Sequence, residues 1–254
     1  MDLHITHLPL WVNLSFGIFF VIVPPYLIAN AAKQALSNAS RPDPNKIRNL
    51  ILFFFLVYFM AIGITSLGGF FVTNSLPPKI IVVAALPLML FYLIIVQRKI
   101  WFKYALKSIE LEQLVYVHIF RLVGVYFLIA NSYGALPDNF ALIGGVGDIL
   151  TAILTLPVLY YLRKKASFSI SLVWMWNVFG LIDILSVLVT ALIVTREAIL
   201  NSESGIIQFG TFPFSWIPAF APATIIFLHI LIFKKLIRRK LATTNNKLNE
   251  PTEL

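Results

Sequence analysis

This sequence of 254 residues contains no cysteine and few charged residues. Without cysteine, disulfides and thiolate metal sites are excluded. Only 12% of the residues are charged and 59% are hydrophobic, whereas soluble domains carry about 25% charged residues. The P-loop, the H-E-x-x-H zinc motif and the G-x-S-x-G nucleophile motif are also missing, so none of these three enzyme classes is indicated. The composition excludes an ordinary soluble protein.

Seven apolar runs are each long enough to form a helix across the hydrocarbon core of a bilayer, which takes about 20 residues. The runs are residues 8–28, 49–71, 78–96, 114–136, 139–162, 169–194 and 212–233. They predict an all-α fold, a polytopic bundle of seven transmembrane helices whose main partner is the lipid bilayer. We expect a single transmembrane domain over residues 1–240. The polar residues 241–254 are expected to form a disordered cytoplasmic tail.

Basic residues predict how this bundle is oriented. Seventeen of the 20 Lys and Arg residues fall in segments 33–48, 98–107, 163–165 and 234–247, which alternation of the runs places on one side. Only Lys79 and Arg196 belong to the other side. Because cytoplasmic loops carry the excess of positive charge, we predict a multi-pass protein of the cell membrane, with its N-terminus outside and its C-terminus cytoplasmic. The net charge of +9 thus mainly reflects the topology, and contact with anionic lipids is its second interpretation. No nucleic-acid partner is expected.

Residues 99–114, between the third and fourth runs, alternate aromatic and basic side chains. This pattern is typical of a helix that lies in the membrane interface. We therefore expect an interfacial segment on the cytoplasmic side, directly before the fourth membrane helix.

Two aspartates share a local pattern within neighbouring apolar runs. Gly145-x-x-Asp148 is followed by Ile-Leu-Thr, and Gly180-x-x-Asp183 is followed by Ile-Leu-Ser. Residues three apart share a helix face, so each Asp has a glycine one turn before it. Each glycine is expected to let a second backbone come close, as small residues do in membrane helices. An acid in hydrocarbon costs a few kcal/mol (~2.5–3.5), so both are expected to face protein or a water-filled cavity.

An ion pair between Arg121 and Asp148 is predicted. Counted at ~1.5 Å per helical residue, these two residues and Asn177 lie roughly 12 to 16 Å from the cytoplasmic edge. The tight turn at 135–138 makes the fourth and fifth helices antiparallel neighbours. The pair either fixes helix packing alone or lines a ligand or ion site. Asp183 is placed further out with no obvious cation, either as a proton carrier or as a neutral, hydrogen-bonded acid.

Two intramembrane histidines, His118 and His229, are expected at similar depth on different helices. Such a pair can ligate a haem iron or bind one metal ion. The alternative is that both are ordinary hydrogen-bonded histidines. Haem is therefore the one organic cofactor that the sequence suggests. In the last run, Pro218 and Pro222 share one face with His229, which predicts a kinked helix beside a cavity. That run contains no lysine, so a retinal Schiff base is excluded.

Four patterns carry a resemblance to a known group of proteins. They are His118-x-x-Arg121-x-x-Gly124, Gly134-x-Leu136-Pro137-x-x-Phe140-Ala141, Gly145-x-Gly147-Asp148 and Trp176-Asn177-x-x-Gly180-x-x-Asp183. Together they resemble a group of uncharacterised bacterial integral membrane proteins. The resemblance implies a bacterial origin, covers the fourth to sixth runs, and brings no activity or mechanism with it.

From the sequence we predict an integral membrane protein that binds or translocates a small polar ligand or proton, as a transporter would. The site residues are Arg121, Asp148, Asn177 and Asp183. One alternative is a haem- or metal-binding redox protein or enzyme using His118 and His229. Another is a non-catalytic membrane partner subunit, in which the glycines only allow tight packing. No catalytic residue is assigned, and the ligand and the oligomeric state are left open.

Overall fold

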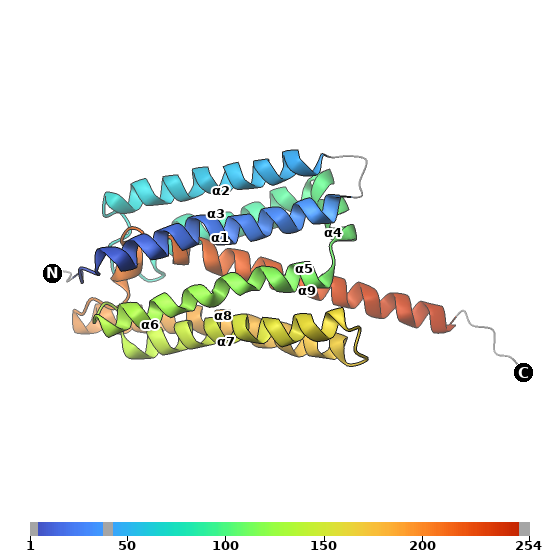
Figure 1. Cartoon of the computed structure of the whole chain (residues 1–254). Helices are drawn as coiled ribbons and strands as arrows, with labels where there is room; N and C mark the ends of the chain where they lie inside the picture. The colour runs from blue at the N-terminus through green and yellow to red at the C-terminus, as the bar shows by residue number, and fades with distance from the viewer. Residues whose placement is uncertain (1–4, 38–42, 249–254) are drawn as a thin grey trace, which may run out of the picture.

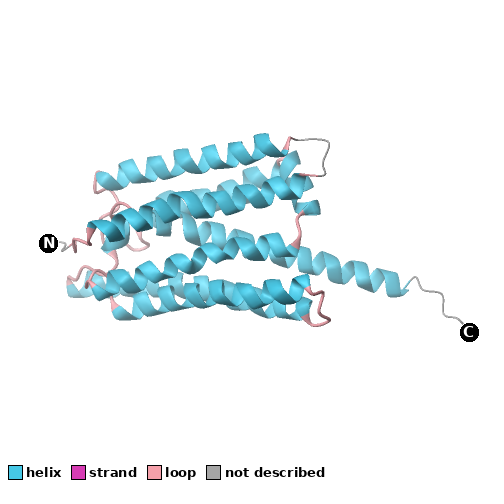
Figure 2. Cartoon of the chain, in the orientation of Figure 1, coloured by secondary structure: helices cyan, strands magenta, loops and turns pink. Residues whose placement is uncertain are grey.

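The computed structural model describes residues 5–37 and 43–248. Within these residues, seven helical spans are long and apolar enough to cross a membrane, as the sequence predicts. The spans run side by side along one common direction (Figure 1). All regular elements of the described residues are helical (Figure 2). The protein is therefore an all-α, multi-pass membrane protein.

Five of the seven spans are continuous helices. They are α1 (Leu10–Leu36), α2 (Pro44–Leu67), α7 (Asp138–Arg163), α8 (Ser169–Asn201) and α9 (Trp216–Leu248). Two shorter helices lie in the connections, α4 (Ile100–Ser108) after the third span and the 3₁₀ turn η5 (Ile207–Gly210) before α9.

The third and fourth spans change their helical form along their length. The third is built from η1 (Ile81–Ala85), α3 (Leu86–Leu90), η2 (Phe91–Ile95) and η3 (Val96–Arg98). The fourth is built from α5 (Leu111–Val117), the 3₁₀ segment η4 (His118–Gly124) and α6 (Val125–Ser132). A 3₁₀ stretch inside a longer helix often marks a functional site, and η4 carries two of the predicted site residues.

Three helices extend well beyond their predicted ends, the first being α1, which continues past 28 to Leu36. α8 continues past 194 to Asn201, because residues 195–201 include the helix formers Arg, Glu, Ala and Leu. It ends at Ser202, which adopts a left-handed backbone conformation. α9 continues to Leu248, so the segment from 241 that we expected to be disordered begins as helix. Residues 249–254 lie outside the described part, and the division into domain and tail stays a prediction.

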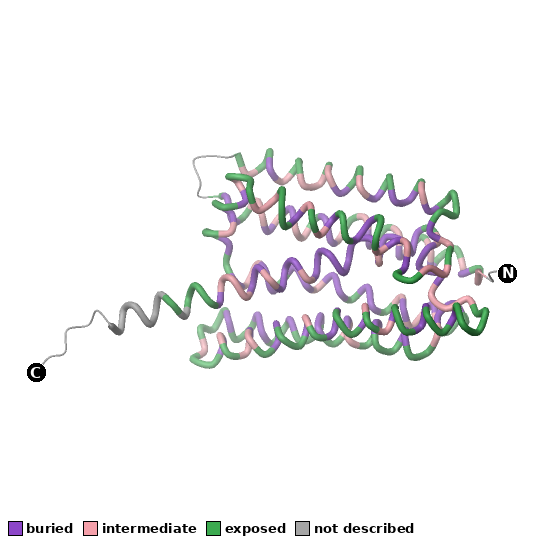
Figure 3. The backbone as a smooth tube through the Cα atoms, turned by 180° about the vertical axis from the view of Figure 1, so that it is seen from behind, coloured by how far each residue is buried: buried purple, intermediate pink, exposed green. Residues whose placement is uncertain are grey.

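α9 is the central helix of the bundle. In Figure 1 it runs between α1, α2 and α3 on one side and α5–α6, α7 and α8 on the other. It contacts α2, α3, α5 and α8. In its apolar part 78% of the residues are buried, against 22% to 56% in the other six spans. Figure 3 shows this burial as a purple stretch through the middle of the bundle.

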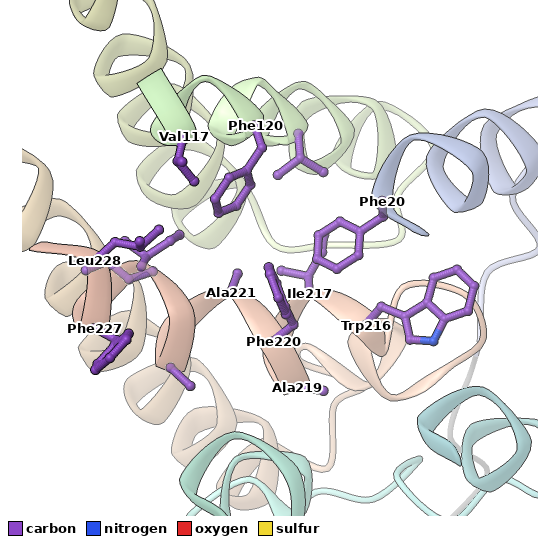
Figure 4. Packing of buried hydrophobic residues seen from close by; sticks show 14 of the residues in the cluster. Phe20, Val117, Phe120, Trp216, Ile217, Ala219, Phe220, Ala221, Phe227 and Leu228 are labelled. Atoms are coloured by element: carbon purple, nitrogen blue, oxygen red, sulfur yellow. The ribbon is translucent and has the colours of Figure 1, made fainter. Parts of the chain in front are cut away.

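Aromatic side chains fill the space around α9 (Figure 4). The ring of Phe220 lies 5.3 to 6.0 Å, centroid to centroid, from the rings of Phe20, Phe55, Phe59 and Phe120. Ring pairs at these distances stabilise a core beyond the area that they bury. The packing joins α9 to α1, α2 and η4 and fixes the helix that completes the site.

The outer faces of the bundle carry large apolar side chains. Phe53 of α2, Met175 of α8 and many Leu and Ile residues are mostly exposed. A soluble monomer rarely exposes apolar surface on this scale, whereas such a surface suits the hydrocarbon of a bilayer. Hydrocarbon is therefore the natural surrounding of these faces.

One end of the bundle carries most of the basic residues and is called the basic end. It holds the end of α1, the start of α2, the segments 98–110 and 163–168, and the C-terminal part of α9. The opposite end holds the start of α1 and the segment 202–215. The N-terminus lies at the opposite end and α9 leaves at the basic end (Figure 1). Which of the two faces the cytoplasm stays a prediction.

Candidate functional site

Arg121 occupies the centre of the site. It lies in η4, is 0% exposed, and is the largest side chain among the fully buried residues. Its Nε donates a hydrogen bond to Asp148 Oδ1 of α7 over 2.6 Å. The ion pair predicted between these two residues is therefore present.

Asp183 of α8 is a second partner of the same guanidinium. The Nη2 group of Arg121 donates to Asp183 Oδ2. Our expectation that Asp183 has no cation was wrong, because depth was counted between backbones and left out the reach of the long arginine side chain. The 3₁₀ segment η4, which rises about 2.0 Å per residue instead of 1.5 Å, adds a smaller shift.

The remaining nitrogen of the guanidinium connects the ion pairs to α9. Nη1 donates to Gly180 O over 3.0 Å and lies 3.4 Å from Nε2 of His229. Because arginine only donates hydrogen bonds, Nε2 of His229 must accept. The ring proton of His229 is thus on Nδ1, which lies 2.8 Å from Asn177 Oδ1. Asn177 also donates from Nδ2 to the backbone oxygen of His229 over 3.3 Å.

All four predicted ligand-site residues therefore belong to one hydrogen-bonded network. Asn177 and Asp183 are on different sides of α8, and they meet through His229 and Arg121 rather than directly. The donors of Arg121 are directed at two carboxyls, one carbonyl and one imidazole. Arg121 is thus a counter-ion for the protein's own acids, and an external anion would have to displace one of them.

Glycines make the close packing at this network feasible. A Cβ on Gly145 would lie 2.9 Å from the backbone oxygen of Gly124, so α7 and η4 touch through their backbones as predicted. A Cβ on Gly180 would instead lie 2.7 Å from Cε1 of His229, so a side chain fills that space. The sequence reasoning gave Gly147 no role, but a Cβ there would collide with the Asp183 carboxylate. The position of Gly147 in the Gly-x-Gly-Asp pattern was the sequence feature that could have indicated this role.

His118 lies beside the network and is unusual in its hydrogen bonding. It is fully buried, and neither ring nitrogen has a hydrogen-bond partner among the described residues. Its ring centroid is 4.3 Å from that of His229 and 5.1 Å from that of Trp176. Trp176 in turn donates from Nε1 to Thr151 O of α7 over 3.0 Å. The two predicted histidines therefore do meet, as ring neighbours.

This histidine pair does not fit a haem or a shared metal ion. Axial ligands on the two sides of a haem must leave room for the porphyrin, which rings 4.3 Å apart do not. Both nitrogens of His229 already face Asn177 and the Arg121 cation, so neither is free to ligate. In the part of the chain that the structure describes, no three His, Cys, Asp or Glu residues are grouped for a metal ion.

The charges of the network do not balance when both acids are ionised. Among the described residues, Arg121 is the only Lys or Arg that is buried, while Asp148 and Asp183 are both buried. One positive charge then faces two negative charges. The network is neutral when one of the two carboxyls holds a proton.

A cavity of about 60 Å³ reaches Asp148. It is lined by Pro218 and Pro222 of α9, as the proline pattern predicted, and by Lys79 near the opposite end. Thr195 also lines it, with a buried hydroxyl that has no partner among the described residues. A water needs roughly 10 to 15 Å³ of such volume, so this cavity has room for several waters between Asp148 and the opposite end.

Comparison with known proteins matches the chain to a family model described as a domain of unknown function (DUF8737). The match spans residues 77–237, which include the third to sixth spans, most of the seventh, and every residue of the network. No curated protein and no solved structure matches the chain. The match agrees with the resemblance to an uncharacterised family, while the bacterial origin stays a prediction. The chain belongs to the DUF8737 family, whose function is unknown.

Proposed function

We propose that this protein binds a proton at the Arg121–Asp148–Asp183 network and translocates it across the membrane. The observation that carries the proposal is the sharing of one buried guanidinium by two buried carboxyls. A buried, uncompensated charge is costly, so the network gains stability by holding one proton. Intramembrane acids of this kind commonly serve as proton relays.

The arrangement favours a proton over a metal cation. Metal cations such as Mg²⁺ and Ca²⁺ take about six to eight oxygen ligands, whereas two carboxyl groups already bound to Arg121 supply few. Of the four carboxyl oxygens, Arg121 donates to Oδ1 of Asp148 and Oδ2 of Asp183. The other oxygen of each carboxyl is therefore the place for the shared proton.

A cavity on one side of Arg121 and titratable groups on the other support translocation in addition to binding. Asp148 lines the cavity that extends toward Lys79 and the opposite end, and waters there would carry a proton to its carboxyl. On the other side of Arg121, His229 and His118 continue the series of titratable groups toward the basic end. His118 is nearer that end than Arg121, because the fourth span begins there. The nitrogens of His118, which have no hydrogen-bond partner within the described residues, are suited to accept and release a proton in turn.

A flux measurement in liposomes tests this function. The purified protein is reconstituted around a pH-sensitive dye, and a potassium gradient with valinomycin drives proton entry. We expect the wild-type protein to accelerate acidification and Asp148→Asn to abolish the effect, because the Arg121–Asp183 pair that remains is neutral without a proton. Asp183→Asn should also abolish the effect, because the Arg121–Asp148 pair that then remains is neutral without a proton.

The matched control is Glu197→Gln, which removes an exposed carboxylate from α8, the same helix as Asp183. It should leave the flux unchanged. Wild-type flux no faster than that of empty liposomes would overturn translocation. Full flux in Asp148→Asn would show that the network only fixes helix packing, as a non-catalytic partner subunit would require.

A further inference from the structure

A second, larger cavity lies in the half of the bundle at the basic end. Its volume is about 360 Å³, within the range of about 300 to 1,000 Å³ typical of small-molecule pockets. Its walls come from α1, α2, η2, α4, α5 and α9. The side chains that line it include Ile28, Phe54, Phe55, Tyr92, Phe102 and Leu228.

The walls of this cavity suit hydrocarbon and not water. An enclosed water needs two to four polar partners, and the lining is almost entirely aliphatic and aromatic. The two hydroxyls that line it, those of Tyr92 and Thr224, lie 2.9 Å apart and bond to each other. An apolar occupant is therefore the natural filling.

The amphipathic helix α4 forms the wall of the cavity at the basic end. Phe102 and Ala105 line the cavity and are buried, whereas Lys103 and Lys107 on the same helix are exposed. The helix belongs to the segment 99–114, for which the sequence predicts an interfacial position, and its apolar face closes part of the cavity. The α4 side of the cavity is therefore next to the exposed ammonium groups of Lys103 and Lys107.

Basic residues dominate this rim. Lys99 lines the cavity and is exposed, and Arg98 beside it is exposed as well. Lys235 of α9 lies close to α4, donating to Lys107 O over 3.0 Å. One acid at the same end, Glu110, caps the start of α5. The rim is thus mainly positive.

We propose that this cavity binds one acyl chain of an anionic phospholipid from the leaflet at the basic end. The chain lies against Phe54, Phe102 and Leu228, and the phosphate is held by Lys99 and Lys103. Charge complementarity selects the headgroup, because lysine is a common phosphate ligand and basic clusters at the interface attract anionic lipids. The proposal does not depend on proton translocation, since none of these residues belongs to the Arg121 network.

Lipid retention measured by native mass spectrometry tests the proposal. The protein is delipidated in mild detergent and titrated with phosphatidylglycerol or phosphatidylcholine of the same chain length. We expect phosphatidylglycerol to be retained at least tenfold more tightly and to raise the melting temperature. The double variant Lys99→Gln/Lys103→Gln should lose this preference. The matched control Lys164→Gln/Lys165→Gln, at the same end but beside α7, should keep it.

Variants that fill the cavity provide a second test of the proposal. Ala105→Phe, or Ala32→Leu if the first variant does not fold, places new side-chain atoms in the chain site without altering the rim charges. Either should lower retention of phosphatidylglycerol at least tenfold. Equal retention of the two lipids by the wild-type protein would overturn the assigned headgroup. Unchanged retention in the folded filled variant would overturn the assigned cavity.

Discussion

The two Gly-x-x-Asp segments differ in their surroundings although their sequences match and both acids bind Arg121. Asp148 lines the cavity toward the opposite end, and its glycine touches a backbone oxygen. Asp183 lies over Gly147 between α7 and α8, and its glycine faces the ring of His229. The Gly-x-x-Asp pattern thus specifies close packing, whereas the helix that lies across from each aspartate decides its partner and its access to a cavity.

Removal of the shared cation should have the largest effect. In Arg121→Met both acids lose their counter-ion, and breaking a buried pair costs about 3–5 kcal/mol. We expect a large fall in the melting temperature in detergent. The control Arg163→Met breaks the exposed pair with Glu112, where an ion pair is worth about 0–1 kcal/mol. Equal melting temperatures of the two variants would contradict a central role for Arg121.

Neutralising both acids together should cost more than neutralising them one at a time. Asp148→Asn and Asp183→Asn each leave one neutral Arg–Asp pair, so we expect modest losses of stability. The double variant buries an unpaired arginine, and we expect a further loss of about 3–5 kcal/mol. A double-mutant cycle on the unfolding free energies measures this coupling. Simple additivity of the two single effects would show that the carboxyls do not share the cation.

A smaller change should separate the two acids. Gly147→Ala pushes against the Asp183 carboxylate and leaves the 2.6 Å pair of Asp148 in place. Overpacking of this kind costs about 1–3 kcal/mol. Gly17→Ala in α1 is the control, since its nearest neighbour atom lies at an ordinary 3.6 Å. Thermal unfolding of both variants should show the difference, and an unaffected Gly147→Ala would mean that Asp183 lies elsewhere.

Much of this architecture is predictable from the sequence. The seven apolar runs specify seven spans because a helix must satisfy its own backbone in hydrocarbon. The Arg121–Asp148 pair follows from similar depth on neighbouring helices. The Asp183 contact did not follow, because a depth count places backbones and leaves out the reach of the Arg121 side chain. The residues HIFRLVG also gave no sign of the 3₁₀ segment that carries Arg121. The contact of His229 with Arg121 also escaped prediction, because it depends on where α9 packs between the two groups of helices.

Infrared spectroscopy of the protein in lipid vesicles tests the shared proton most directly. A protonated carboxyl has a C=O band that is separate from the bands of ionised carboxylates, and it shifts in heavy water. The charge balance of the network predicts one such band in the wild-type protein at neutral pH. The band should disappear in Asp148→Asn and in Asp183→Asn and persist in Glu197→Gln. No band in the wild-type protein, or a band that survives in both Asp variants, would contradict the account.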